Sequence, residues 1–108
     1  MLLHCVFCQL RDDAEPAELA RVQALLAGLV GQVQGMTAFR AGPNRDYEGK
    51  SPDHGWGFVC TFRDRAAHLA YEAHPDHQAA GAALVALCKG GHAGIVVYDI
   101  ETDGGADV

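Results

Sequence analysis

Positive charge is scarce in this chain of 108 residues, which has 8 Lys and Arg against 14 Asp and Glu and a formal net charge of -6. No stretch gathers the Lys and Arg residues into a basic cluster. Nucleic acids and anionic membranes are bound mainly through such clusters. We therefore expect neither a nucleic-acid partner nor a membrane partner. The chain also lacks the run of roughly 20 apolar residues that a membrane-spanning helix needs.

The beginning of the chain lacks the features of a secretion signal, because no basic segment precedes its short apolar stretch and the chain turns polar at residues 9–11. This predicts a soluble, cytoplasmic protein. The cysteines agree with that compartment. In a strand Cys5 and Cys8 would point to opposite faces and could not chelate one metal together. We expect all four cysteines to be reduced thiols in apolar surroundings: Cys5, Cys8, Cys60 and Cys88.

Motifs that bind common cofactors are also missing. The chain has no phosphate-cradling glycine loop, no serine nucleophile elbow and no complete metal signature, so we expect no cofactor and no metal. His74 and His77 do form a His-x-x-His pair, to which Asp76 or His4 could add a ligand. Pro75 lies between the two histidines and interrupts a regular helical face, so metal binding here is an alternative to the metal-free interpretation.

The residues that are present predict a single domain over residues 1–101 and a Gly- and Asp-rich tail over 102–108 that we expect to fray. Apolar residues spaced by threes and fours predict a helix from Pro16 to Val33. Asp64 is a suitable N-cap for a helix that breaks near His74, and Pro75 can open the next one. The remaining elements are strands at 3–10, 36–41, 56–62 and 93–100, a polar loop at 42–53 and a last helix that runs to residue 88.

The predicted order β-α-β-β-α-β is typical of an α+β, ferredoxin-like fold, an antiparallel sheet with its helices on one face. Alternation along the first strand assigns His4 to the helix face. The other face would be apolar, and soluble monomers rarely expose such a face. We therefore predict a homodimer through the open face of the sheet, related by a twofold axis. The residues assigned to this open face are Cys5, Phe7, Val59, Ile95 and Val97.

The same pattern resembles the stress-responsive A/B barrel family, known as Dabb. The resemblance covers the chain before the tail and rests on four stretches: His4-Cys5-Val6-Phe7, Gly57-Phe58-Val59-Cys60-Thr61-Phe62, Ala70-Tyr71-Glu72-Ala73-His74-Pro75-Asp76-His77 and Tyr98-Asp99. It implies a dimeric α+β barrel. A few plant members are similar to polyketide cyclases, and by that resemblance His77 would be the general base and Tyr71 would assist it. Those members have a strand-three histidine where this chain has Trp56, which weakens the cyclase interpretation.

The candidate site residues each have a structural alternative. His77 lies near a helix start, where an imidazole stays neutral and can act as a base, or it simply fixes the loop. Contact between His77 and Tyr71 depends on the bend at Pro75. His4 lines a pocket or is a core histidine that finds a partner in Tyr71 or His77. We predict catalytic roles for His77 and Tyr71, ligand-binding roles for His4, Trp56, Phe58 and His74, and surface positions for His54, His68 and His92.

Three functions agree with these features. The first is a homodimer that binds a small hydrophobic or aromatic molecule between sheet and helices. The second is a cofactor-independent enzyme, a polyketide-cyclase-like lyase or isomerase with His77 as general base. The third is another function of a related fold, such as a cofactor-free monooxygenase or a structural partner protein. A pocket lined by a few aromatic and aliphatic side chains accepts many shapes, so the sequence does not name the ligand.

Overall fold

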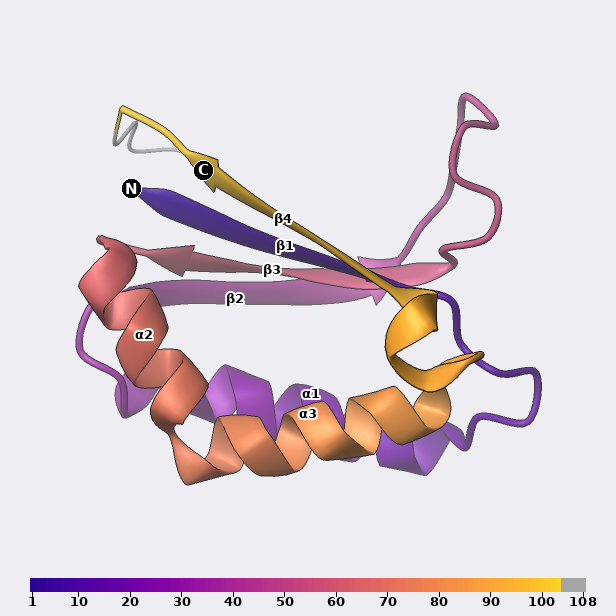
Figure 1. Ribbon diagram of the computed structural model, residues 1–108, viewed down its shortest axis with the longest axis horizontal. Coiled ribbons are helices and arrows are strands. Elements are labelled where there is room, and N and C mark those ends of the chain that lie inside the picture. The colour runs from indigo at the N-terminus through magenta and orange to yellow at the C-terminus, as the bar shows by residue number, and fades with distance from the viewer. Residues whose placement is uncertain (104–108) are drawn as a thin grey trace.

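Strand β1 (Leu2–Cys8) runs through the middle of a four-stranded antiparallel sheet in a computed structural model that describes residues 1–103 (Figure 1). Its neighbours are β3 (Trp56–Phe62) on one side and β4 (Ile95–Glu101) on the other, and β2 (Met36–Pro43) pairs with β3 at the far edge. The order β2-β3-β1-β4 is that of a ferredoxin-like α+β fold. The predicted fold class is confirmed.

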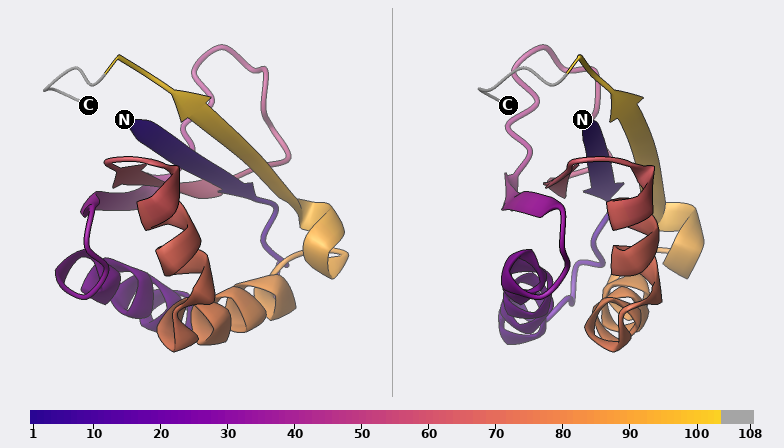
Figure 2. Two further views of the ribbon diagram at one scale, coloured as in Figure 1. Left: turned by 60° about the vertical axis from the view of Figure 1, so that its left-hand side comes forward. Right: turned by 90° about the vertical axis from the view of Figure 1, so that its left-hand side faces the viewer.

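All helices lie on one face of this sheet (Figures 1 and 2). The predicted first helix is observed as α1 (Pro16–Gly28), followed by a short 3-10 helix, η1 (Leu29–Gly31). The other helices are α2 (Arg65–Ala73), α3 (Pro75–Leu87) and the 3-10 helix η2 (Gly91–Gly94). Helices α1 and α3 pack side by side beneath the sheet.

The junction between α2 and α3 follows the prediction. The carboxylate of Asp64 accepts a 2.9 Å hydrogen bond from the backbone N–H of Ala67 and so caps α2. His74 ends α2 in an extended conformation, and its Nδ1 accepts a 3.0 Å hydrogen bond from the N–H of Asp76 at the start of α3. Pro75 is the first residue of α3. One histidine therefore ends one helix and caps the next.

Two strand boundaries differ from the prediction. Strand β1 ends at Cys8, and Leu10 forms only an isolated bridge with Cys88. Strand β4 starts at Ile95, because residues 91–94 form η2. A Cβ atom at Gly94 would clash with the carbonyl oxygen of Lys89, so this position requires glycine. Of the predicted tail, Thr102 donates its N–H to the carbonyl oxygen of Met1 at 2.8 Å. Residues 104–108 lie outside the described part of the chain.

The prediction for the two faces of β4 was wrong. Val6 lies directly opposite Val97, and Cys8 lies opposite Ile95. Directly paired residues project to the same face of a sheet, so Ile95 and Val97 share the helix face with Val6. The residues of β4 on the open face are Val96, Tyr98 and Ile100. The pairing register between strands decides this, and the alternation within one strand does not reveal the register.

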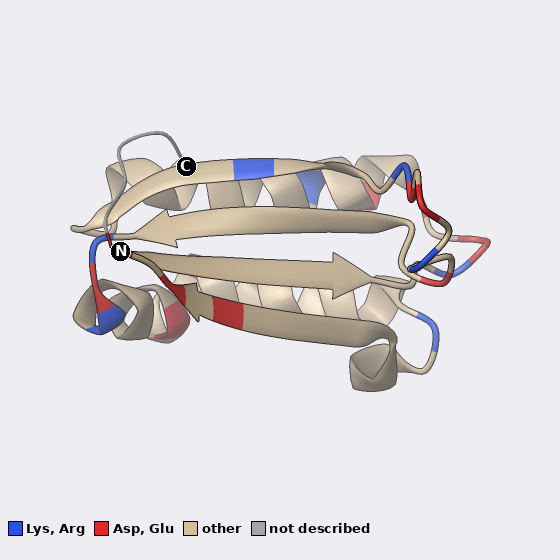
Figure 3. Cartoon of the chain, turned by 90° about the horizontal axis from the view of Figure 1, so that it is seen from above, with Lys and Arg blue, Asp and Glu red and all other residues tan. Residues whose placement is uncertain are grey.

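The open face of the sheet has few charged residues, because Lys, Arg, Asp and Glu gather in the loops at its two ends (Figure 3). The loop over residues 44–55 rises from this face, away from the helices (Figures 1 and 2). Asp46 shapes it, since one carboxylate oxygen accepts the N–H groups of Lys50 and Ser51. A hollow of about 450 Å³ lies between the loop and the strands, with Phe7 and Tyr98 in its lining. None of the helices in residues 1–103 has the length and hydropathy to cross a membrane.

Candidate functional site

A cavity of about 350 Å³ lies between the helix face of the sheet and the helices. Its lining is mostly aliphatic, with Val6, Leu26 and Leu84 among the contributors. Four aromatic side chains join them from four different elements: His4 of β1, Phe58 of β3, Tyr71 of α2 and His77 of α3. Such an apolar hollow with a few converging polar groups is the usual form of a small-molecule site.

Tyr71 and His77 face each other across the helix junction. Their ring centroids are 4.3 Å apart with the planes at 51°. The extended backbone at His74 turns α3 back, so that His77 contacts Tyr71, six residues earlier in the chain. The contact depends on this bend, as predicted. Tyr71 is fully buried, and its hydroxyl oxygen accepts a weak 3.8 Å hydrogen bond from the thiol of Cys60. Burial raises the pKa of Tyr71 well above its ordinary value, so the phenol keeps its proton and acts as a donor.

His77 is oriented by the backbone of α2. Its Nδ1 lies 3.2 Å from the carbonyl oxygen of Glu72, and because a carbonyl only accepts, Nδ1 carries the proton. The lone pair is then on Nε2. Burial lowers the pKa of His77 below its ordinary value, which keeps the ring neutral at pH 7. The sequence predicted a neutral ring from the helix start, whereas burial is the principal cause in the structure.

His4 lies on the helix face as predicted, but its partner is Asp99. Nδ1 of His4 donates a 2.6 Å hydrogen bond to a carboxylate oxygen of Asp99 on β4. The Tyr71 ring is 5.7 Å away and contributes an edge contact. The hydrogen bond to Asp99 fixes the orientation of the His4 ring. Asp99 was missed as a site residue, and the signal that would have found it is its place opposite His4 in the β1–β4 register.

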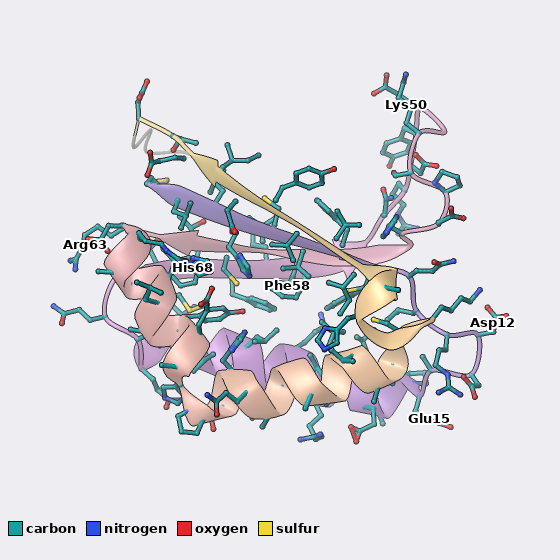
Figure 4. The ribbon with its side chains drawn as sticks, viewed as in Figure 1. Asp12, Glu15, Lys50, Phe58, Arg63 and His68 are labelled. Carbon is teal, nitrogen blue, oxygen red and sulfur yellow. The ribbon has the colours of Figure 1, made fainter. Side chains whose placement is uncertain are left out.

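The prediction of a surface position for His68 was wrong, because its side chain is buried between α2 and the sheet, as Figure 4 shows. Its ring centroid is 4.6 Å from that of His4. Arg65 donates a 2.6 Å hydrogen bond to Nδ1 of His68. Nε2 lies 3.1 Å from a carboxylate oxygen of Glu72, at an angle that forms no hydrogen bond. The signal in the sequence was the helical spacing of His68 and Tyr71, three residues apart on one face.

Burial lowers the pKa of His68, and the nearby His4 lowers it further. His68 is therefore neutral at pH 7, like His77. Its contact with Arg65 agrees with this, since a protonated Nδ1 could not accept the guanidinium hydrogen. His54 is half-buried beside the loop at residues 44–55, and His92 is exposed at the rim of the cavity.

The remaining predicted ligand-binding residues lie in different places. Phe58 lines the cavity, and Figure 4 shows it between the sheet and the helices. Trp56 is buried against Phe58, with ring centroids 5.9 Å apart, but it is not part of the cavity wall as the structure describes it. His74 caps α3 and is also absent from that wall. The site residues that the structure brings together are thus His4, Phe58, Tyr71 and His77, joined by Asp99 and His68.

One group within residues 1–103 has donor atoms close enough to hold a metal ion: His4, His68 and Asp99, within 4.8 Å of one another. The donors are already engaged. Asp99 holds the Nδ1 proton of His4, and Arg65 occupies Nδ1 of His68 with a positively charged donor. A cation here would have to displace both hydrogen bonds and lie beside a guanidinium group. The predicted His74 and His77 pair is also divided, since Nδ1 of His74 accepts from α3 and Nδ1 of His77 donates to Glu72.

Comparison with protein families places a match along nearly the whole chain. The model of the stress responsive A/B barrel domain matches residues 2–102. No curated protein matches the chain in sequence.

Several solved structures share the fold. A dimeric ferredoxin-like protein of unknown function from Jannaschia sp. CCS1 is 44% identical, with a TM-score of 0.89 over 94% of this chain and 98% of that one. A protein from Arabidopsis thaliana is 21% identical, with a TM-score of 0.80 over 98% and 99%. The hydroxynitrile lyase from Passiflora edulis is 15% identical, with a TM-score of 0.78 over 96% and 94%. The similarities to the Arabidopsis and Passiflora proteins, at 21% and 15% identity, show a shared fold and nothing more.

Proposed function

Since the chain belongs to the stress responsive A/B barrel family, we propose that it forms a homodimer and binds a small organic molecule in the cavity between sheet and helices. One observation carries the ligand proposal. His4, Tyr71 and His77 bring ring nitrogens and a hydroxyl to the wall of a cavity of about 350 Å³ whose lining is mostly apolar. An oxygen-bearing ligand can form hydrogen bonds with such groups while the apolar walls bury the rest of it.

The chemistry of the wall limits the class of ligand. Nε2 of the neutral His77 ring accepts a hydrogen bond, and the phenol of Tyr71 donates one. A ligand with a hydroxyl beside a carbonyl supplies both kinds of group. Phe58 offers an aromatic surface to the rest of the molecule. The site therefore favours an uncharged or weakly acidic aromatic or enolic compound.

The open face of the sheet supports the homodimer. Its residues on β4 include Tyr98 and Ile100, which are 59% and 51% exposed in the single chain. An apolar face of this kind is normally covered, and a twofold axis lets the face cover its own copy. The protein from Jannaschia that shares 44% of its residues with this chain is described as dimeric.

A thermal-shift screen tests the ligand proposal. The protein is melted with aromatic acids, phenols and short polyketide mimics, and the same compounds are applied to His77→Ala and Tyr71→Phe. A ligand at about 100 times its dissociation constant adds about 2.7 kcal/mol to the free energy of unfolding. We expect a shift for the wild type and a much smaller one for both variants. His54→Ala, changed beside the distant loop, is the matched control and keeps the full shift. Equal shifts in all four proteins would place the ligand elsewhere and overturn the proposal.

A second candidate function is proton-transfer catalysis without a cofactor, supported by the different proton states of His77 and Tyr71. Nε2 of His77 takes a proton from a carbon next to a carbonyl group. The electron pair of that C–H bond passes to the carbonyl oxygen, to which the phenol of Tyr71 donates a hydrogen bond. The resulting enolate carbon attacks a second carbonyl, and the protonated His77 returns its proton to the alkoxide. A hydroxynitrile lyase has the same fold, so the fold accommodates a lyase.

The rate of aldol cyclisation of a short 3,5,7-trioxo acid, in which C2 attacks the C7 carbonyl to close a six-membered ring, separates this function from binding alone. The reaction is followed by chromatography and mass spectrometry. A general base contributes about 10²- to 10⁴-fold, so His77→Ala would lose that factor in the rate at saturating substrate. A wild-type rate equal to that of buffer would exclude this reaction and leave the binding function.

A further inference from the structure

The cavity continues outward into a groove, and the two share their boundary. The groove has a volume of about 540 Å³ and runs along α3. Five residues line both spaces: Glu72, His77, Gly81, Val85 and His92. Because these residues face the cavity on one side and the groove on the other, they surround the passage between them. Only Gln78 and Ala82 belong to the groove alone.

Gly81 lies in the middle of this passage. It is four residues after His77 and four before Val85, so the three form one stripe on α3. A glycine in a helix interior costs stability relative to alanine, and two structural reasons normally explain one. The first is a positive φ angle, which Gly81 does not have. The second is close packing, but a Cβ atom built at Gly81 would have no atom within 4 Å.

The absent side chain therefore leaves space in front of Gly81, where the cavity meets the groove. We propose that Gly81 keeps this passage open, and that the site takes elongated ligands whose polar head lies beside His77 while an apolar extension passes Gly81 into the groove. Val85 and Ala82 offer the extension an apolar surface there. This inference rests on the proposed binding function and adds the length and shape of the ligand.

Three variants on α3 test the proposal. Gly81→Leu fills the passage, Gly81→Ala narrows it slightly, and Ala79→Leu adds the same side chain at an exposed position that lines neither space. The probes are phenol and its 4-alkyl derivatives with chains of one to eight carbons, titrated by calorimetry. Each methylene that reaches the groove strengthens binding by up to about fourfold.

We expect Gly81→Leu to weaken the long-chain probes by at least about tenfold while the affinity for phenol changes little. Ala79→Leu should bind the whole series like the wild type. If Gly81→Leu weakens phenol and the octyl derivative equally, or neither of them, the groove does not hold the extension and the proposal fails.

Chemical modification of histidines tests, without a bound ligand, whether Gly81 keeps the passage open. Diethyl pyrocarbonate acylates neutral histidines, and His4 is nearly buried in the cavity, whereas His54 lies beside the distant loop. Peptide mass spectrometry gives the rate at each residue. We expect Gly81→Leu to slow acylation of His4 severalfold and to leave His54 unchanged. Equal rates at His4 in all variants would show that Gly81 does not control the passage. If no phenol binds the wild type but acylation of His4 is slowed in Gly81→Leu, the proposed ligand class fails and the passage stands.

Discussion

Nδ1 of His4 and a carboxylate oxygen of Asp99 lie 2.6 Å apart, although 95 residues separate them in the chain. The two residues are directly paired in the β1–β4 register, so the sheet itself holds the hydrogen bond. The carboxylate thereby fixes the orientation of the His4 ring in the cavity wall.

Replacing Asp99 by Leu should lower the free energy of unfolding by about 1 kcal/mol, because the nearly buried His4 loses its acceptor. The estimate is modest because the carboxylate is 42% exposed. Urea denaturation measures the effect. Glu101→Leu, two residues along the same strand and face, removes the same charge and is the control. An equal loss in both variants would show that the hydrogen bond contributes nothing.

Stability should fall as the pH drops below about 6.5, the ordinary pKa of histidine in an unfolded chain. The pKa values of His68 and His77 are lowered in the folded protein by burial. Between the lowered values and 6.5 the unfolded chain binds protons that the folded chain does not, so the stability present above 6.5 is lost as the pH falls through this window. Asp13 and Asp46, whose pKa values are also lowered, act only in a more acidic range.

The double variant His68→Leu, His77→Leu isolates these two groups. Its free energy of unfolding should vary less between pH 7 and pH 5 than that of the wild type, whatever its absolute stability. Denaturation at several pH values provides both curves. Parallel curves for the two proteins would assign the pH dependence to other residues.

Replacement of glycine by alanine should raise the free energy of unfolding at Gly81 and lower it at Gly57. Gly81→Ala should raise the free energy of unfolding by about 0.5–1 kcal/mol, because the helix gains propensity and the new Cβ has free space. Gly57→Ala should lower it by about 1–3 kcal/mol, because its Cβ would lie 2.8 Å from the ring of Phe7 and from the carbonyl oxygen of Val6. Thermal melts of both variants give the signs. A destabilised Gly81→Ala protein would reveal a packing role for that position.

Replacing Tyr98 by Lys should dissociate the proposed homodimer, because it places a charge on the face that the second copy would cover. We expect the dissociation constant to rise by at least about tenfold. Sedimentation velocity over a range of protein concentrations measures it. Leu69→Lys, at a position that is 48% exposed on α2, is the control for a charge on the helix side. A wild type that sediments as a monomer throughout would contradict the proposed assembly.

Local signals in the sequence were sufficient for the fold. Asp64, His74 and Pro75 each act within a few residues of their own position, so their roles at the helix ends could be predicted from spacing alone. The faces of β4 depend instead on which residue of β1 lies opposite, and a shift of one residue exchanges the two faces. The faces assigned to Ile95 and Val97 were wrong for that reason.

The site was predictable only in part for the same reason. Tyr71 and His77 lie six residues apart and meet through a local bend, and both were identified. Asp99 reaches His4 through pairing of the two ends of the chain, which no spacing reveals. His68 was predicted at the surface, although its spacing from Tyr71 indicated the buried face of α2.

The shared cap at His74 also makes the length of the junction part of the site. Each residue added to a helix turns everything after it by about 100° about the helix axis. One inserted residue between Tyr71 and His77 would move the imidazole to another side of α3, even with all the original side chains still present. Deletions would act in the same way. Side chains around the cavity can therefore be exchanged, but the number of residues between Tyr71 and His77 must stay the same.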